Sequence, residues 1–149
     1  MKLYLIRHAQ SSNNVLWNGS DNNEGRHSDP EITDIGHRQA EKLGQHMAHP
    51  QAEPRQHPFN SQPQTHYGLT HVYCSLMSRS VLTAQYIAEA CGLELQALTN
   101  IFEKNGVYDY DEAGEMVGQP GPSRSYFEQR FPDVRLPEII NSEGWWSRP

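Results

Sequence analysis

The sequence predicts an α/β fold, with a mostly parallel sheet and helices on both of its faces. Three short apolar runs, at residues 3–6, 69–74 and 93–101, have the length and composition of buried strands. Two segments with apolar residues at helical spacing lie between them. Because parallel strands need helical crossovers, this alternation indicates a parallel sheet. The 149 residues suffice for a single domain with a sizeable core.

The first predicted strand, residues 3–6, leads directly into Arg7 and His8. One interpretation makes His8 a nucleophile or acid–base group and Arg7 an anion clamp. The other is an edge strand that ends in two solvated residues, and these residues alone favour it. The polar segment 10–31 then predicts a long loop. Loops of this length in a compact domain are usually functional or disordered, and we expect function here because this one leaves the Arg–His turn.

The first helix is predicted to begin after Thr33, a suitable N-cap, and to close at Pro50. Its apolar face comprises Ile35, Ala40, Leu43 and Met47. Residues 49–68 contain four prolines, four glutamines and three histidines, which predicts a polar surface insertion. The irregular spacing of these histidines, 49, 57 and 66, favours solvated side chains over a metal site.

The second predicted strand is followed by a polar turn, in which Ser78 can cap a helix over residues 79–91 that Gly92 ends. The apolar face of that helix comprises Val81, Ala84, Ile87, Ala88 and Cys91. Ligands of open parallel sheets bind beyond the carboxyl ends of the strands. The first strand delivers Arg7 and His8 to that rim, the second Arg79 at a helix N-terminus, and the third Glu103. This topology predicts an anion-binding site.

The remaining residues predict loops over 109–122 and a short helix over 123–131 with Ser123 as its cap. Trp145 and Trp146 either form a specificity wall or pack against the sheet edge, and we favour packing.

Composition limits the partners. A net charge of −6 argues against nucleic acids and anionic membranes, but not against a small anionic substrate held by a few arginines. Cys74 and Cys91 fall in a predicted strand and helix, which indicates free thiols and a reducing compartment. The short N-terminal apolar run is not a signal peptide, and no run approaches a membrane span, so we expect a cytoplasmic protein. The oligomeric state is not predicted.

Four motifs in order resemble the histidine phosphatase superfamily, which includes the phosphoglycerate mutases. The first is Leu5–Ser11 with Asn14, and the second is Asp29–Thr33 with Gly36, Gln39 and Ala40. The third is Ser75–Ser80 with Thr83 and Ala84, and the fourth is Ile101–Glu103 with Gly106. Together they cover residues 3 to 108.

The resemblance implies metal-independent phosphomonoester hydrolysis, without a cofactor, through a phosphohistidine at His8. Arg7 and Arg79 would clamp the phosphoryl oxygens, and Asn14 would position the phosphate or the substrate. Glu103 would protonate the leaving oxygen, which requires a raised carboxyl pKa. The substrate would be a small phosphorylated molecule or a phosphoprotein, with specificity in loops 10–31 and 109–122.

The sequence also departs from the family pattern. Ala9 stands where Gly is commoner and Gln10 where mutases carry Glu, so mutase activity is the weakest alternative. The family has a second histidine near its C-terminus, whereas none of the eight histidines here follows His71. We therefore expect one phosphatase-like domain over 1–149, truncated or divergent, without the C-terminal strand and helix. The alternative function is a catalytically weak or inactive phosphate-binding pseudophosphatase or fragment.

Overall fold

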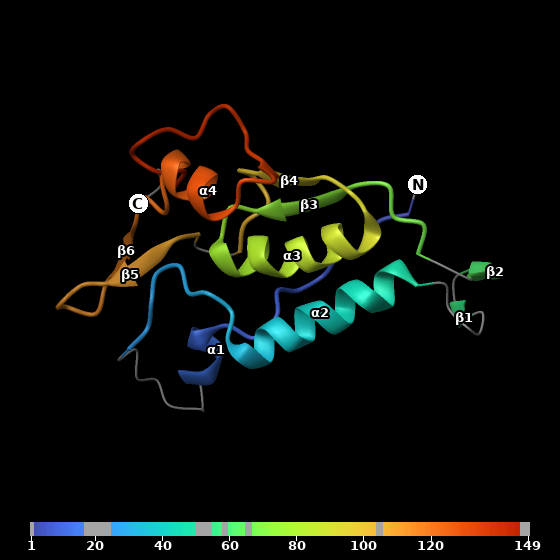
Figure 1. Ribbon diagram of the computed structural model, residues 1–149. Helices are drawn as coiled ribbons and strands as arrows, with labels where there is room; N and C mark the ends of the chain where they lie inside the picture. The colour runs from blue at the N-terminus through green and yellow to red at the C-terminus, as the bar shows by residue number, and fades with distance from the viewer. Residues whose placement is uncertain are drawn as a thin grey trace.

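The centre of the fold is a three-stranded parallel sheet of order β3-β4-β7 (Figure 1). The computed structural model describes residues 2–16, 25–49, 55–57, 60–64, 67–103 and 106–146. The strands are β3 (Val72–Ser75), β4 (Leu95–Leu98) and β7 (Val134–Arg135). Val72 pairs with Leu95, which in turn pairs with Val134. The predicted α/β fold with a mostly parallel sheet is confirmed.

Two long helices, α2 (Asp34–Ala48) and α3 (Ser78–Cys91), lie side by side, and α3 also packs on β3 (Figure 1). Their close approach depends on Gly44, where a Cβ would lie 2.3 Å from the carbonyl oxygen of Tyr86. The predicted caps Thr33 and Gly92 are confirmed: Thr33 Oγ1 accepts a hydrogen bond from Gly36 N (3.1 Å), and Gly92 has a φ of 65°.

The predicted apolar face of α2 is only partly correct. Ala40 and Met47 are buried and Leu43 is partly buried, but Ile35 is 48% exposed. The face that approaches the rest of the molecule at this end carries Gly36, where a Cβ would lie 2.2 Å from the Gln10 carbonyl oxygen. A close backbone contact therefore occupies the first turn of α2, and Ile35 lies outside it.

The first predicted strand is wrong. Residues 2–10 contain no strand, and Leu3 and Leu5 are 75% and 91% exposed. Within the described residues, β4 is the only strand beside β3, and no strand pairs with residues 3–6. A continuous apolar run is buried only where neighbouring strands and covering helices enclose both of its faces. Without a backbone ladder, this segment stays extended with its apolar side chains in solvent.

Three other segments differ from expectation. The predicted loop 10–31 contains a short helix, α1 (Ser12–Leu16). Within the polar residues 49–68, β1 (Arg55–His57) and β2 (Asn60–Gln64) form an antiparallel pair. The predicted loop 109–122 contains the hairpin strands β5 (Tyr108–Tyr110) and β6 (Met116–Gly118). The strands of both pairs have only three to five residues each, which is too short for their pattern to separate them from loops.

The last helix, α4 (Arg124–Arg130), is confirmed with Ser123 as its N-cap. It contributes Phe127 to a core that also contains Leu76 and Val81 of the β3–α3 unit. Cys74 and Cys91 are free thiols, as predicted. Of the histidines 49, 57 and 66, His66 and the side chain of His57 lie outside the described residues. No helix in the described part of the chain is long and apolar enough to cross a membrane.

Candidate active site

The candidate site is built around the buried side chain of Arg79 in the first turn of α3. Its Nη2 atom donates to Met77 Sδ (3.1 Å) and to a carboxylate oxygen of Glu103. Its Nη1 atom lies 3.8 Å from Asp29 Oδ1, and no described residue forms a hydrogen bond with it. Only 8% of the Arg79 side chain is exposed. The buried guanidinium group thus has one N–H donor without an acceptor among the described residues. Such a donor costs free energy unless a ligand supplies the acceptor.

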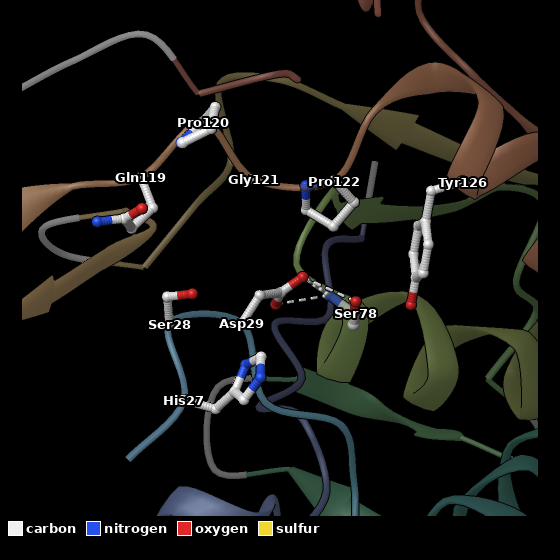
Figure 2. Close-up of a pocket in the computed structure, with 9 residues that line it drawn as sticks. All are labelled: His27, Ser28, Asp29, Ser78, Gln119, Pro120, Gly121, Pro122 and Tyr126. Atoms are coloured by element: carbon white, nitrogen blue, oxygen red, sulfur yellow. Dashed lines mark hydrogen bonds between the residues drawn. The ribbon is translucent and has the colours of Figure 1, made fainter. Parts of the chain in front are cut away.

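The start of α3 is capped by a residue from a distant loop. The Asp29 carboxylate accepts hydrogen bonds from Ser78 N (3.0 and 3.2 Å) and from Ser78 Oγ (2.7 Å), as Figure 2 shows. Met77, the N-cap residue by position, makes no capping hydrogen bond with its side chain. The prediction that Ser78 caps this helix is therefore wrong. Burial raises the pKa of Asp29, although the hydrogen bonds from Ser78 and the charge of Arg79 oppose that rise.

This cap changes how an anion is held. We expected the backbone N–H groups at the start of α3 to attract one, but the first of them already donates to Asp29. A carboxylate at this position uses the positive end of the helix dipole. An external anion at this end of the site would compete with Asp29 for the Ser78 N–H group, whereas the Nη1 donor of Arg79 has no hydrogen-bond partner among the described residues.

His8 is oriented by its neighbouring backbone. Its Nδ1 atom lies 2.6 Å from the carbonyl oxygen of Ala9, and a carbonyl can only accept, so Nδ1 carries the hydrogen. Nε2 of the neutral ring then has a free lone pair. Burial lowers the pKa of His8, as do the charges of Arg79 and Arg7, whereas the Ala9 contact and Glu103 oppose this. The neutral, nucleophilic form of the imidazole is favoured.

The turn that carries His8 is tied to α3 through Thr83. Ala9 N donates to Thr83 Oγ1 (3.0 Å), which in turn donates to the Arg79 carbonyl oxygen (2.7 Å). Thr83 belongs to the motif that contains Arg79, but sequence reasoning gave it no role. Its position on the same helix, one turn after Arg79, is the signal that would have identified it.

Glu103 reaches Arg79 from the segment after β4. Burial alone would raise its pKa, but the hydrogen bond and charge of Arg79, with the charges of His8 and Arg7, outweigh it and lower the pKa. The expectation of a raised pKa is thus wrong for the unliganded site. Arg7 is exposed, yet it is near enough to influence both His8 and Glu103. The structure therefore brings Arg7, His8, Arg79 and Glu103 together.

Asn14 lies in α1, where its side chain closes the turn after His8. Its Oδ1 atom accepts hydrogen bonds from Ser11 N (2.9 Å) and Ser11 Oγ (3.1 Å). The amide Nδ2 atom makes no hydrogen bond with the described part of the chain and is available as a donor. Phosphate positioning by Asn14 stays a prediction.

Trp146 packs beside the loop that carries Glu103, and Trp145 packs against the hydrophobic core. Trp146 packs edge to face on Phe102, with ring centroids 4.6 Å apart. Gly106, with a φ of 65°, admits the indole, since a Cβ there would lie 2.1 Å from it. The backbone N–H groups of Trp145 and Trp146 both donate to the Pro120 carbonyl oxygen, at 3.0 and 2.9 Å. The packing role that we favoured is confirmed for Trp145, which packs against the hydrophobic core, whereas Trp146 contacts the loop on both sides of Glu103.

Comparison with known proteins agrees with this arrangement. The family model of the histidine phosphatase superfamily (branch 1) matches residues 3–144. Probable phosphoglycerate mutases GpmB from Yersinia pestis (strain Pestoides F) and Yersinia pseudotuberculosis (serotype O:1b, strain IP 31758) are each 27% identical to the chain over 139 residues. The match covers 93% of the chain and 54% of each relative, so the chain spans about half the length of these relatives. With its two arginines, histidine and carboxylate at one rim, the chain belongs to the histidine phosphatase superfamily.

Proposed function

We propose that this protein hydrolyses phosphomonoesters without a metal, through a phosphohistidine at His8. One observation carries the proposal: the buried Arg79 Nη1 donor has no hydrogen-bond partner among the described residues, and the charge of Arg79 acts on a neutral, oriented His8. A phosphoryl oxygen supplies the partner that this donor lacks. The arginine charge also stabilises the negative charge of phosphoryl transfer.

Substrate binding would change the protonation state of Glu103. A phosphate that takes the Arg79 guanidinium competes with the Glu103 carboxylate for Nη2. Loss of that hydrogen bond removes the largest interaction that lowers the Glu103 pKa, while burial still raises it. Glu103 then takes up a proton from solvent, and the substrate itself generates the general acid.

The reaction would proceed in two steps. In the first, His8 Nε2 attacks phosphorus; the N–P bond forms, the ester P–O bond breaks, and Glu103 gives its proton to the leaving oxygen. In the second, water attacks the phosphohistidine while Glu103 accepts a water proton, which releases phosphate and restores neutral His8. Arg7 and Arg79 hold the phosphoryl oxygens in both steps.

A second candidate function is phosphate binding without turnover. It is favoured by the four family motifs of this sequence, among whose matching residues His8 is the one imidazole. Mutase activity, the function in the names of the Yersinia relatives, is a third candidate, which Gln10 disfavours.

The test compares wild type with His8→Ala and with His71→Ala, which alters an exposed histidine outside the site. We expect wild type and His71→Ala to release phosphate from para-nitrophenyl phosphate and to carry an acid-labile phosphate after an acid quench. His8→Ala should do neither. Vanadate binding without turnover or labelling would instead support the phosphate-binding function, and labelling that survives His8→Ala would refute the assignment of the nucleophile.

A further inference from the structure

A pocket of about 310 Å³ lies beside the candidate site, between two loops (Figure 2). His27, Ser28 and Asp29 line one side, and residues 119–122 lie across from them. Ser78 and Tyr126 complete the lining. These segments belong to 10–31 and 109–122, the two regions in which the sequence places substrate specificity.

The pocket adjoins the phosphate clamp through two of its own residues. Asp29 lies 3.8 Å from Arg79 Nη1, and Ser78 directly precedes Arg79 in α3. A molecule whose phosphate is bound by Arg79 can therefore extend its alcohol portion into this space.

The lining offers hydrogen bonds that the protein does not use. The side chains of His27, Ser28 and Gln119 make no hydrogen bonds with other residues in the described ranges. Hydroxyl, amide and imidazole groups both donate and accept, which suits the hydroxyl groups of a ligand.

The charges of the lining oppose a second anion. Among the described residues that line the pocket there is no lysine or arginine, whereas the carboxylate of Asp29 is one of them. A second carboxylate, Glu31, accepts a long hydrogen bond from the Tyr126 hydroxyl group (3.4 Å). The nearby cations Arg79 and Arg130 already pair with Asp29 (3.8 Å) and Glu31 (3.6 Å), so the described lining offers no lysine or arginine of its own to a second anionic group.

We propose that this pocket binds the alcohol portion of the substrate and selects neutral, hydroxylated phosphomonoesters over those with a second anionic group. The proposal rests on the proposed phosphatase function and specifies its substrate class. Gln119 is a specificity-determining residue in this scheme, because its amide is free and a cation in its place would accommodate a carboxylate.

The test uses glycerol 3-phosphate and 3-phosphoglycerate, which differ only in a hydroxymethyl group against a carboxylate. Dissociation constants from calorimetry and kcat/KM would be measured for wild type, Gln119→Lys and Gln45→Lys. Gln45 is an exposed residue of α2, so its substitution adds the same charge away from the pocket. We expect wild type to prefer glycerol 3-phosphate by about tenfold, since like charges a few ångströms apart cost on the order of 1 kcal/mol or more. Gln119→Lys should remove most of this preference, and Gln45→Lys should retain it.

The outcomes separate this proposal from the function on which it rests. Equal affinity of wild type for the two ligands, or the same preference in Gln119→Lys and Gln45→Lys, would overturn the pocket assignment even if His8 becomes phosphorylated. Selective binding of glycerol 3-phosphate without phosphohistidine would retain the pocket and refute hydrolysis. Melting curves of the two lysine variants would confirm that both are folded.

Discussion

The N-terminal segment and the β3–α3 unit carry the same kind of sequence, an apolar run followed by a turn with an arginine, yet they differ in structure. β3 has a parallel neighbour and a covering helix, so its turn delivers a buried Arg79. Residues 3–6 have no strand partner in the described ranges, and Arg7 is exposed. The position of an arginine after an apolar run therefore depends on what encloses the run as well as on the motif.

The largest expected contrast is in stability. Leu76→Ala removes a fully buried side chain at the end of β3 and should lower the free energy of unfolding by about 2–5 kcal/mol. Leu5→Ala, at a side chain that is 91% exposed, should change it by less than about 0.5 kcal/mol. Chemical denaturation of both variants measures the difference. A large loss in Leu5→Ala would show that the N-terminal segment is buried as a strand.

The next contrast concerns the two arginines. Arg79→Ala should lower kcat/KM by about 100-fold, because a buried, fixed donor to the phosphoryl group is lost. Arg7→Ala should cost about tenfold, since an exposed guanidinium is screened by water. Steady-state kinetics with para-nitrophenyl phosphate tests this order. Equal losses would contradict the unequal roles that burial indicates.

A smaller effect separates the two partners in the cap of α3. Asp29→Ala removes the carboxylate that accepts both hydrogen bonds of Ser78 and that lies beside Arg79. It should lower the free energy of unfolding by about 1–3 kcal/mol. Ser78→Ala removes only the hydroxyl hydrogen bond and should cost about 1 kcal/mol. Asp29→Asn retains an acceptor and should recover part of the loss. Identical unfolding curves for Asp29→Ala and wild type would contradict the cap.

The smallest expected effect is a shift in pH dependence. Because burial and the two arginine charges lower the pKa of His8, its neutral form persists below the ordinary imidazole value of about 6.5. As the pH falls below about 6.5, the imidazole of the unfolded chain takes up a proton before that of the folded chain. The free energy of unfolding therefore decreases with falling pH in this range. Arg7→Gln should raise the His8 pKa, as followed by the NMR titration of its ring protons. A fall or no change would show that Arg7 does not act on His8.

The sequence predicted those features that depend on local pattern. Apolar spacing and turn residues predicted three helices, α2, α3 and α4, with the caps Thr33 and Ser123, and a parallel sheet that contains β3 and β4. The hairpin of β5 and β6 was missed, because strands of three residues are too short for alternation to distinguish them from a loop. The exposed N-terminal segment was also missed, since a short apolar run does not reveal whether strands will flank it.

At the candidate site, the sequence indicated which residues lie there, but not which contacts they make with one another. The predicted sheet topology indicated that Arg7, His8, Arg79 and Glu103 lie close together, although the first strand of that topology is absent from the described residues. It could not indicate that Glu103 would pair with Arg79 and so have a lowered pKa, because that depends on a contact between residues 24 positions apart. The roles of Asp29 and Thr83 likewise depend on contacts across the fold.

The cap on α3 joins Asp29 and Ser78, which are 49 positions apart in the chain, so opening of the cap can be followed at one amide. The Ser78 N–H group at the start of the helix has its hydrogen-bond acceptor only while the loop that carries Asp29 is docked. In amide hydrogen exchange, the Ser78 N–H group should therefore open with that loop and not with the helix. Exchange at the Ser78 amide would thus report, at equilibrium, how often the loop that carries Asp29 moves away from Arg79.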